Sequence, residues 1–265
     1  PFFLAACLAL GCVACEAEKK QGPPGDESRP SLLPAPTDSE TIPTPPDADP
    51  YEITGRLRLR SGAIPRRASA VPTAQSQGAT RPFTVTALQS FVRSQVPATL
   101  QLVTHHAYWY VDDRITFDRA ALESSAREFE ERTYPTDIRH FGDSIRAGFD
   151  GDPRLTVLLT RFGGAAGYYS SPDEYPKAVH PFSNERLMLY INAGALPPGG
   201  RGFNSVVAHE LQHALHYHAD PNEESWVNEG LSTLAEELNG FRNNSASVFQ
   251  AAPNVQLTAW EENPA

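Results

Sequence analysis

The sequence predicts an α+β fold in which several β-strands precede a closing pair of helices. Three observations support this prediction. Short segments rich in β-branched and aromatic residues occupy the middle of the chain, one segment between them has helical spacing, and two helical segments follow one another near the C-terminal end. With 265 residues, 40% of them hydrophobic, the chain is long enough for one large domain or two small ones.

Each expected element has its own local signal. Strands are expected where β-branched and aromatic residues gather, and helices where apolar residues recur every three or four positions. In order, the sequence predicts a strand at 100–111, a helix at 117–132, a short buried strand at 155–160, a glycine-rich loop at 163–169, a strand at 186–191, and helices at 205–218 and 226–238. Asp220-Pro221 and Asn239-Gly240 end the last two helices.

The first 50 residues differ in composition from the rest. Residues 1–15 are apolar and end in small residues, which is typical of a secretory signal, although a buried strand is the alternative. Cys7 or Cys12 resembles the lipid-modified cysteine of a bacterial lipoprotein. Residues 16–50 are rich in Pro, Asp, Ser and Thr and predict a disordered linker. We therefore expect an exported protein, either secreted or anchored by lipid to the cell surface or outer membrane.

Residues 51–97 are expected to form an N-terminal strand and loop segment. Residues 51–60 alternate apolar with basic side chains and predict a half-exposed strand, followed by a loop at 61–82. The arginines in this region, including Arg66 and Arg67, are interpreted as a solvated edge-strand face; a processed pro-segment is the alternative.

Charge and cysteine content exclude several classes of protein. The formal net charge of −10 repels phosphate backbones, so a nucleic-acid partner is not expected. No run of about 20 apolar residues suggests a mature transmembrane helix. All three cysteines lie within residues 1–15, so the folded part is expected to hold no disulfide. The sequence gives no prediction of oligomeric state.

The segment His209-Glu-Leu-Gln-His213 in the penultimate helix has the H-E-x-x-H pattern of a zinc site. Histidines at positions i and i+4 rise from one helical face, so both imidazoles can bind one ion. Glu210 lies beside that face and is the candidate general base. The alternative is a surface helix that carries two histidines by chance.

A catalytic zinc ion takes three protein ligands and keeps one position open. Glu229, near the start of the last helix, is the candidate third ligand, because the short connection requires the two helices to fold back as a hairpin. A solvated glutamate at a helix N-terminus is the alternative. A third histidine ligand six residues after His213 is excluded, since Ala219 stands there.

These motifs resemble those of the gluzincin metallopeptidases, and segments 167–176 and 183–192 are most similar to the hyicolysin family of secreted bacterial peptidases. The resemblance covers about residues 98–260. It implies a zincin-like fold, with a small mixed sheet packed on a zinc-binding helix and a second ligand-bearing helix after it. It also implies zinc ligands His209, His213 and Glu229, with Glu210 as base. Such peptidases continue into a helical subdomain, so the domain at 98–265 is expected to be truncated.

Further residues are candidates for substrate binding. In zincins an edge strand pairs with extended substrate, and strand 186–191, which contains Leu189 and Tyr190, is the candidate here; an ordinary buried strand is the alternative. Tyr168 and His180 are candidate donors to a developing oxyanion, although aromatic residues in a glycine-rich loop more often serve packing.

The sequence thus predicts an exported zinc endopeptidase that acts on protein or peptide substrates. The alternative is a catalytically inactive, zincin-like surface lipoprotein that acts as a binding module. A structural lipoprotein with an accidental motif is a third possibility.

Overall fold

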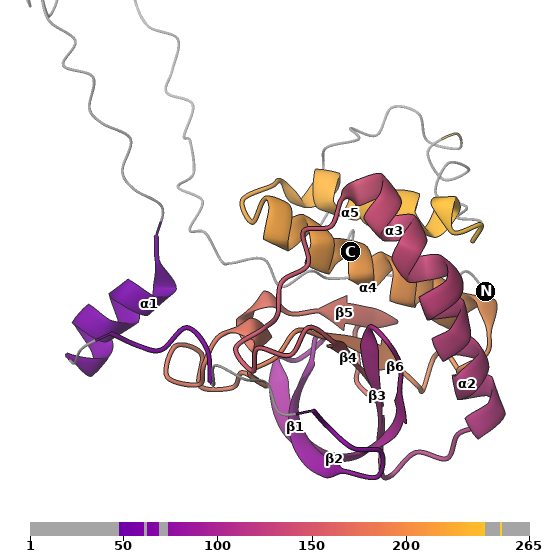
Figure 1. The fold of residues 1–265 in the computed structure, drawn as a ribbon, viewed down its shortest axis with the longest axis horizontal. Coiled ribbons are helices and arrows are strands. Elements are labelled where there is room, and N and C mark those ends of the chain that lie inside the picture. Colours follow the sequence, from indigo (N-terminus) through magenta and orange to yellow (C-terminus); the bar gives the residue numbers. More distant parts are fainter. Residues whose placement is uncertain (1–47, 61–62, 69–73, 242–249, 251–265) are drawn as a thin grey trace, which may run out of the picture.

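The computed structural model describes residues 48–60, 63–68, 74–241 and 250. Its centre is a mixed sheet of six strands in the order β1-β2-β3-β4-β6-β5 (Figure 1). The strands β3, β4 and β6 run parallel to one another, and the remaining pairs are antiparallel. The strands are β1 (Thr80–Ala87), β2 (Val92–Val103), β3 (Ala107–Asp112), β4 (Leu155–Thr160), β5 (Gly167–Tyr169) and β6 (Met188–Asn192).

The sheet curls until its first and last strands are linked by side chains. The backbone N–H of Thr86 in β1 donates to the Tyr168 hydroxyl in β5 at 3.2 Å. The N–H of Thr84 donates to Asn184 Oδ1, just before β6, at 2.8 Å. Side chains of the inner strands alternate between the inside of the curl and the outer face, because successive residues of a strand point to opposite sides. The protein therefore has two hydrophobic cores.

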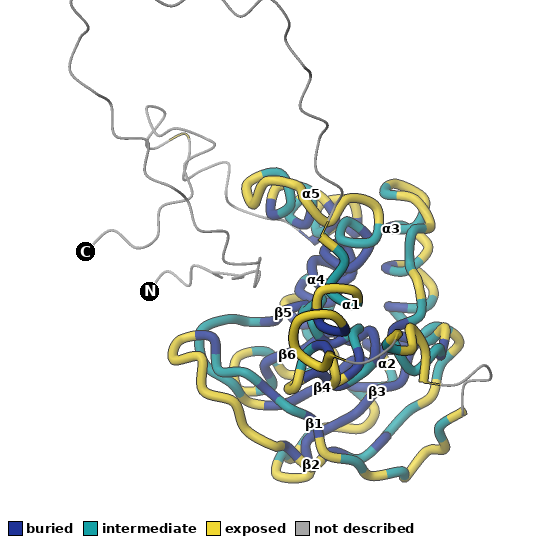
Figure 2. Tube along the Cα trace, turned by 90° about the vertical axis from the view of Figure 1, so that its left-hand side faces the viewer, coloured by how far each residue is buried: buried dark blue, intermediate teal, exposed yellow. Residues whose placement is uncertain are grey.

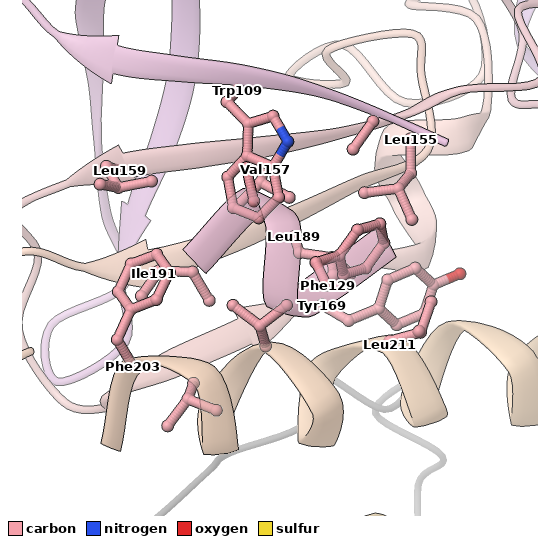
Figure 3. Close-up of a cluster of buried hydrophobic side chains, with 14 of the residues drawn as sticks. Trp109, Phe129, Leu155, Val157, Leu159, Tyr169, Leu189, Ile191, Phe203 and Leu211 are labelled. Carbon is pink, nitrogen blue, oxygen red and sulfur yellow. The ribbon is translucent and has the colours of Figure 1, made fainter. Parts of the chain in front are cut away.

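The helices pack on the outer face of the sheet (Figure 1). They are α2 (Arg119–Glu128), a π-helical turn η2 (Phe129–Thr133), α3 (Tyr134–Phe141), α4 (Arg201–Ala219) and α5 (Ser225–Leu238). The core between sheet and helices includes Trp109, Phe129, Leu155, Val157, Leu159, Tyr169, Leu189, Ile191, Phe203 and Leu211 (Figure 3). Burial of one such leucine stabilises the fold by about 1.5–3 kcal/mol, so this core fixes α4 firmly on the sheet.

The second core lies inside the curled sheet. It is formed by side chains on the face of the strands that points away from the helices. It includes Phe83, Val96, Leu100, Tyr108, Tyr110, Leu158, Tyr168, Met188 and Tyr190. Figure 2 shows that buried residues concentrate in the sheet and in α4, whereas the N-terminal helix α1 (Pro50–Ile53) is largely exposed.

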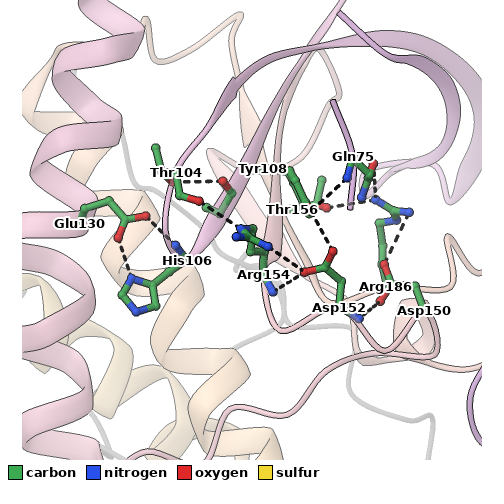
Figure 4. A network of polar contacts seen from close by, with 11 residues as sticks. Gln75, Thr104, His106, Tyr108, Glu130, Asp150, Asp152, Arg154, Thr156 and Arg186 are labelled. Atoms are coloured by element: carbon green, nitrogen blue, oxygen red, sulfur yellow. Dashed lines mark hydrogen bonds and ion pairs between the residues drawn. The ribbon is translucent and has the colours of Figure 1, made fainter. Parts of the chain in front are cut away.

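A polar network joins the loop before β4 to its neighbours (Figure 4). The Tyr108 hydroxyl donates to Asp152 Oδ2 at 2.8 Å, and Arg186 pairs with Asp150 at 3.5 Å. On the other side, His106 Nδ1 lies 2.6 Å from Glu130 Oε2 in η2. These contacts hold the segments that lead into β3, β4 and β6 in place.

The structure confirms an α+β fold and most of the expected elements. The helices expected at 205–218 and 226–238 are α4 and α5, and the strand expected at 155–160 is β4. Asp220 and Asn239 stand at the C-caps of the two helices, and Gly240 has a positive φ of 79°. The helix expected at 117–132 is present and continues through η2 into α3.

The prediction of a strand at 51–60 is wrong, because this segment forms α1 and a π-helical turn, η1 (Thr54–Leu59). The Asp49 side chain accepts a hydrogen bond from the Tyr51 N–H at 2.9 Å, and Pro50 occupies the first helical position. Both features favour a helix start. Alternation of apolar and basic residues was therefore a misleading signal.

The strand expected at 100–111 is two strands, β2 and β3, which are separated by a turn at residues 104–106. The hairpin of β1 and β2 begins at Thr80, so the expected domain start at residue 98 falls inside β2, and the loop expected at 61–82 ends in a strand. Strand 186–191 corresponds to β6, which lies inside the sheet, whereas β5 is the edge strand. The ordinary buried strand was thus the right alternative there.

Some expectations lie outside the described residues. These are the signal-like segment 1–15 with Cys7 and Cys12, most of the linker at 16–50, and the end of the chain after residue 250. Among the helices in the described ranges, none has the length and hydropathy needed to cross a membrane.

Candidate metal centre

The two helices at the end of the described chain form the hairpin that the sequence predicts. Helix α4 ends at Ala219, a short turn follows, and α5 packs back along α4. His209 and His213 lie one turn apart on α4, with their ring centroids 4.7 Å from each other. Glu229 comes from the second turn of α5 and faces both rings. The hairpin thus brings three potential ligands from two elements to one point.

The distances between these side chains suit a small metal ion. His209 Nε2 lies 3.3 Å from Glu229 Oε2, and His213 Nε2 lies 3.7 Å from Glu229 Oε1. One ligand atom from each residue falls within 4.8 Å of the other two. Two atoms bound tetrahedrally to zinc stand about 3.3 Å apart. This buried group could therefore hold a metal ion with little rearrangement.

His209 is oriented by a second glutamate from α5. Its Nδ1 lies 2.8 Å from Glu236 Oε1, and the other carboxylate oxygen of Glu236 accepts a hydrogen bond from the Ser205 hydroxyl at 2.6 Å. With Nδ1–H donating to Glu236, the lone pair of the ring is on Nε2, which faces Glu229. Metal-binding histidines in proteins are commonly held in this way.

His213 is oriented by the amide of Asn228. Its Nδ1 lies 3.0 Å from Asn228 Oδ1 and 3.0 Å from the hydroxyl of Ser232, which itself donates to Gln212 Oε1 at 2.5 Å. Burial and then the neighbouring His209 lower the pKa of His213 to about 4. The ring is therefore neutral at pH 7, with its Nε2 lone pair directed at Glu229 and no hydrogen bond to that atom from the described residues.

Glu210 lies at the interface between α4 and the edge strand β5. The side chain is fully buried. A Cβ added to Gly167 of β5 would stand 3.0 Å from Glu210 Oε1 and 2.4 Å from Val206 Cγ1. Only glycine lets the strand approach the helix this closely. Glu210 thus lies against β5, the edge strand that packs on α4.

The secondary candidates lie away from this group. Tyr168 points into the core inside the curl, where its ring stacks on Tyr190 at 4.1 Å and burial raises its pKa far above the usual range. Leu189 and Tyr190 are buried in β6, so neither can line a groove. The ring of His180 lies 5.1 Å from that of Tyr175, in the loop that follows β5 and η3 and precedes β6. The assignment of these four residues to substrate binding has no support in their surroundings.

Sequence reasoning missed the side chains that orient the histidines. Glu236 lies two turns after Glu229 on the same face of α5, so helical periodicity could have identified it. Asn228 directly precedes Glu229, and its role depends on the angle between the helices, which sequence does not supply.

No protein-family model matches this chain, and no curated protein is significantly similar to it in sequence.

Proposed function

We propose that this protein is a zinc-dependent endopeptidase of the gluzincin type, built on a zincin-like fold and most similar to the hyicolysin family. The observation that carries the proposal is the convergence of His209, His213 and Glu229 in a buried group whose two imidazoles are held with Nε2 toward the carboxylate.

Zinc is the metal that this donor set favours. Two neutral imidazoles and one carboxylate are a common ligand set of catalytic zinc sites, in which a fourth position stays open. Bound there, zinc would lower the pKa of a water molecule and polarise a carbonyl group. His209 and His213 would bind through Nε2, because Glu236 and Asn228 accept the Nδ1 protons.

In the proposed reaction, Glu210 takes a proton from the attacking water. The water oxygen forms a bond to the carbonyl carbon, the C–N bond breaks, and Glu210 delivers its proton to the leaving amine. The immediate products are a carboxylic acid and an amine, which become a carboxylate and an ammonium group when the acid proton passes to the amine, and Glu210 ends in its starting form. A base of this kind contributes typically 10²–10⁴-fold to the rate. Its place beside Gly167, at the edge of the sheet, supports this role.

The proposal assigns binding of the substrate backbone to β5. An extended peptide can add to the free edge of a sheet through main-chain hydrogen bonds. β5 is one of the two edge strands, it pairs only with β6 among the described strands, and it packs on α4. Its register places Gly167 next to the proposed base. We therefore propose that β5 binds the extended substrate, in place of the strand at 186–191 that was expected from the sequence.

The proposed setting is outside the cytoplasm. Residues 1–15 are typical of an export signal, with Cys7 or Cys12 as the lipid-anchored residue, and residues 16–50 are typical of a tether. A lipid anchor would leave the enzyme at a membrane surface.

Peptide cleavage by the zinc-loaded protein tests the proposal. We expect cleavage of a fluorogenic peptide mixture that stops on addition of a chelator and returns with zinc. Glu210→Gln should keep its zinc and lose at least 100-fold in kcat, whereas Glu131→Gln, a change at an exposed glutamate, should cleave normally. A protein that binds zinc stoichiometrically but cleaves no peptide would contradict the enzyme proposal and favour a binding module.

A further inference from the structure

Glu174 lies where the edge strand β5 meets the end of the metal-binding helix α4. It is the last residue of a short 3-10 helix, η3 (Ser171–Glu174), that follows β5. One carboxylate oxygen accepts the hydroxyl hydrogen of Tyr169, the last residue of β5. The other lies 2.6 Å from Nε2 of His218 in the last turn of α4. One buried carboxylate thus joins a strand to a helix.

The direction of the hydrogen bonds in this group is determined by a backbone donor. The N–H of Arg146 donates to Nδ1 of His218 at 3.2 Å. Since a backbone N–H only donates, Nδ1 must hold the lone pair and Nε2 must hold the proton. His218 is therefore a neutral ring that donates to Glu174, and the carboxylate accepts from both of its side-chain partners.

A second contact reinforces the same junction. The hydroxyls of Tyr175, next to Glu174, and Tyr217, next to His218, lie 3.0 Å apart. Two adjacent residues after β5, Glu174 and Tyr175, thus contact two adjacent residues of α4, His218 and Tyr217.

The junction of Tyr169, Glu174 and His218 lies close to the proposed metal site along both β5 and α4. On β5, Tyr169 is two residues from Gly167, which faces Glu210. On α4, His218 lies just over one turn beyond His213. A shift of Tyr169 relative to His218 would therefore move the edge of the sheet relative to the histidine pair.

We propose that Glu174 is a positioning residue that sets the spacing between the edge strand β5 and the metal-binding helix, and through it the binding of extended peptides along β5. This role rests on the proposed function. Glu174 does not touch the ligand group, so its effect belongs to substrate binding by the strand and not to the metal.

Two variants separate the hydrogen bonds from the charge. Glu174→Ala leaves the Tyr169 hydroxyl and the His218 N–H buried without their acceptor, which favours displacement of the strand end. Glu174→Gln keeps the junction, because the amide oxygen can accept from His218 while the amide nitrogen donates to the Tyr169 hydroxyl, which is also an acceptor. The glutamine variant should therefore rescue the alanine variant.

The test compares a long and a short substrate with the zinc-loaded, full-length protein. For an eight-residue peptide, Glu174→Ala should raise KM at least tenfold, with kcat within threefold of wild type. For a blocked dipeptide, which is too short to pair along β5, KM should change less than threefold. Zinc content should be unchanged, and Glu174→Gln and Glu131→Ala should both behave as wild type.

Three results would overturn this role. An unchanged KM for the long peptide, or equal losses for both peptides accompanied by loss of zinc, would show that Glu174 has no specific part in strand positioning. A ¹⁵N spectrum of the wild type in which His218 carries its proton on Nδ1 would contradict the junction itself. Zinc-loaded wild type that cleaves neither peptide would instead contradict the proposed function, and this role with it.

Discussion

Gly167 shows how one residue can couple the sheet to the proposed base. Its hydrogen is the only side group that fits between β5 and α4, because a Cβ would stand 2.4 Å from Val206 Cγ1 and 3.0 Å from the Tyr190 carbonyl oxygen. Valine is stiff and the carbonyl belongs to a paired strand, so neither neighbour yields easily.

We expect Gly167→Ala to lower the free energy of unfolding by about 1–3 kcal/mol, as overpacking of a core does, and to lower peptide cleavage as well. Chemical denaturation and the cleavage assay measure the two effects. Gly230→Ala is the matched control, because a Cβ at this exposed helical position meets nothing within 4 Å. That change should stabilise the protein by about 0.5–1 kcal/mol. A Gly167→Ala protein as stable as wild type would contradict the close approach.

The residues proposed as metal ligands are the part of the site that sequence predicts best. His209 and His213 follow from spacing within one helix, and Glu229 follows from the shortness of the helix connection. The side chains that orient them do not follow so directly, because Asn228 and Ser232 reach His213 only through the crossing of two helices. Tyr168 was expected in a glycine-rich loop, whereas residues 167–169 form β5 through long-range pairing and Tyr168 lies in the core inside the curl.

At the scale of elements, α5 carries one proposed ligand and the carboxylate that orients another. Replacing Glu236 with alanine leaves the Nδ1–H of His209 without its acceptor and frees the ring to turn. We expect zinc affinity to fall by about 10–100-fold, as for other outer partners of metal-bound histidines. Competition with a chromophoric chelator measures this affinity.

Glu131→Ala, which removes an exposed glutamate from η2, should bind zinc as the wild type does. Glu236→Gln should recover part of the affinity, because its amide oxygen can accept the same hydrogen bond. Equal zinc affinities in wild type and Glu236→Ala would contradict the orienting role.

Elements with strong periodic patterns were predicted well, and those with weak patterns were not. α4, α5 and β4 are long or uniformly apolar, so one local signal was enough. β1 contains Pro82, which weakens a strand signal but is tolerated at a sheet edge. Segment 51–60 alternates like a strand, yet the helix start at Asp49 and Pro50 decides its structure. The order of β5 and β6 in the sheet depends on long-range pairing, which no local signal reports.

At the scale of the whole molecule, a buried carboxyl group connects α3 to the end of α5. Asp137 is completely buried, and its Oδ1 accepts a hydrogen bond from Asn239 Nδ2 at 2.7 Å. Burial raises the pKa of Asp137 to about 8, and the hydrogen bond from Asn239 lowers it by less. The carboxyl group is therefore mostly protonated in the folded protein at neutral pH.

This pKa predicts a specific dependence of stability on pH. In the unfolded chain an aspartate has a pKa of about 3.9, so the folded protein holds an extra proton between about pH 4 and pH 8. The stabilisation by this proton is complete below about pH 4 and is lost as the pH rises toward 8, by about 1.4 kcal/mol per pH unit.

Asp137→Asn has no proton to lose and retains a hydrogen-bonding partner for Asn239. Its melting temperature should therefore rise relative to wild type as the pH increases from 5 to 8. Differential scanning calorimetry at several pH values measures this difference, in which the contributions of other carboxyl groups cancel. Melting temperatures that stay parallel over this range would show that Asp137 is ionised in the folded protein.

We propose that one zinc ion binds between His209, His213 and Glu229. An anomalous difference map at the zinc absorption edge, from crystals of the zinc-loaded protein, tests this binding most directly. We expect one strong peak about 2.0–2.2 Å from Nε2 of each histidine and from a Glu229 oxygen, and no such peak in His213→Ala. A peak elsewhere, or no peak at this group in crystals that contain zinc, would contradict zinc binding by these residues.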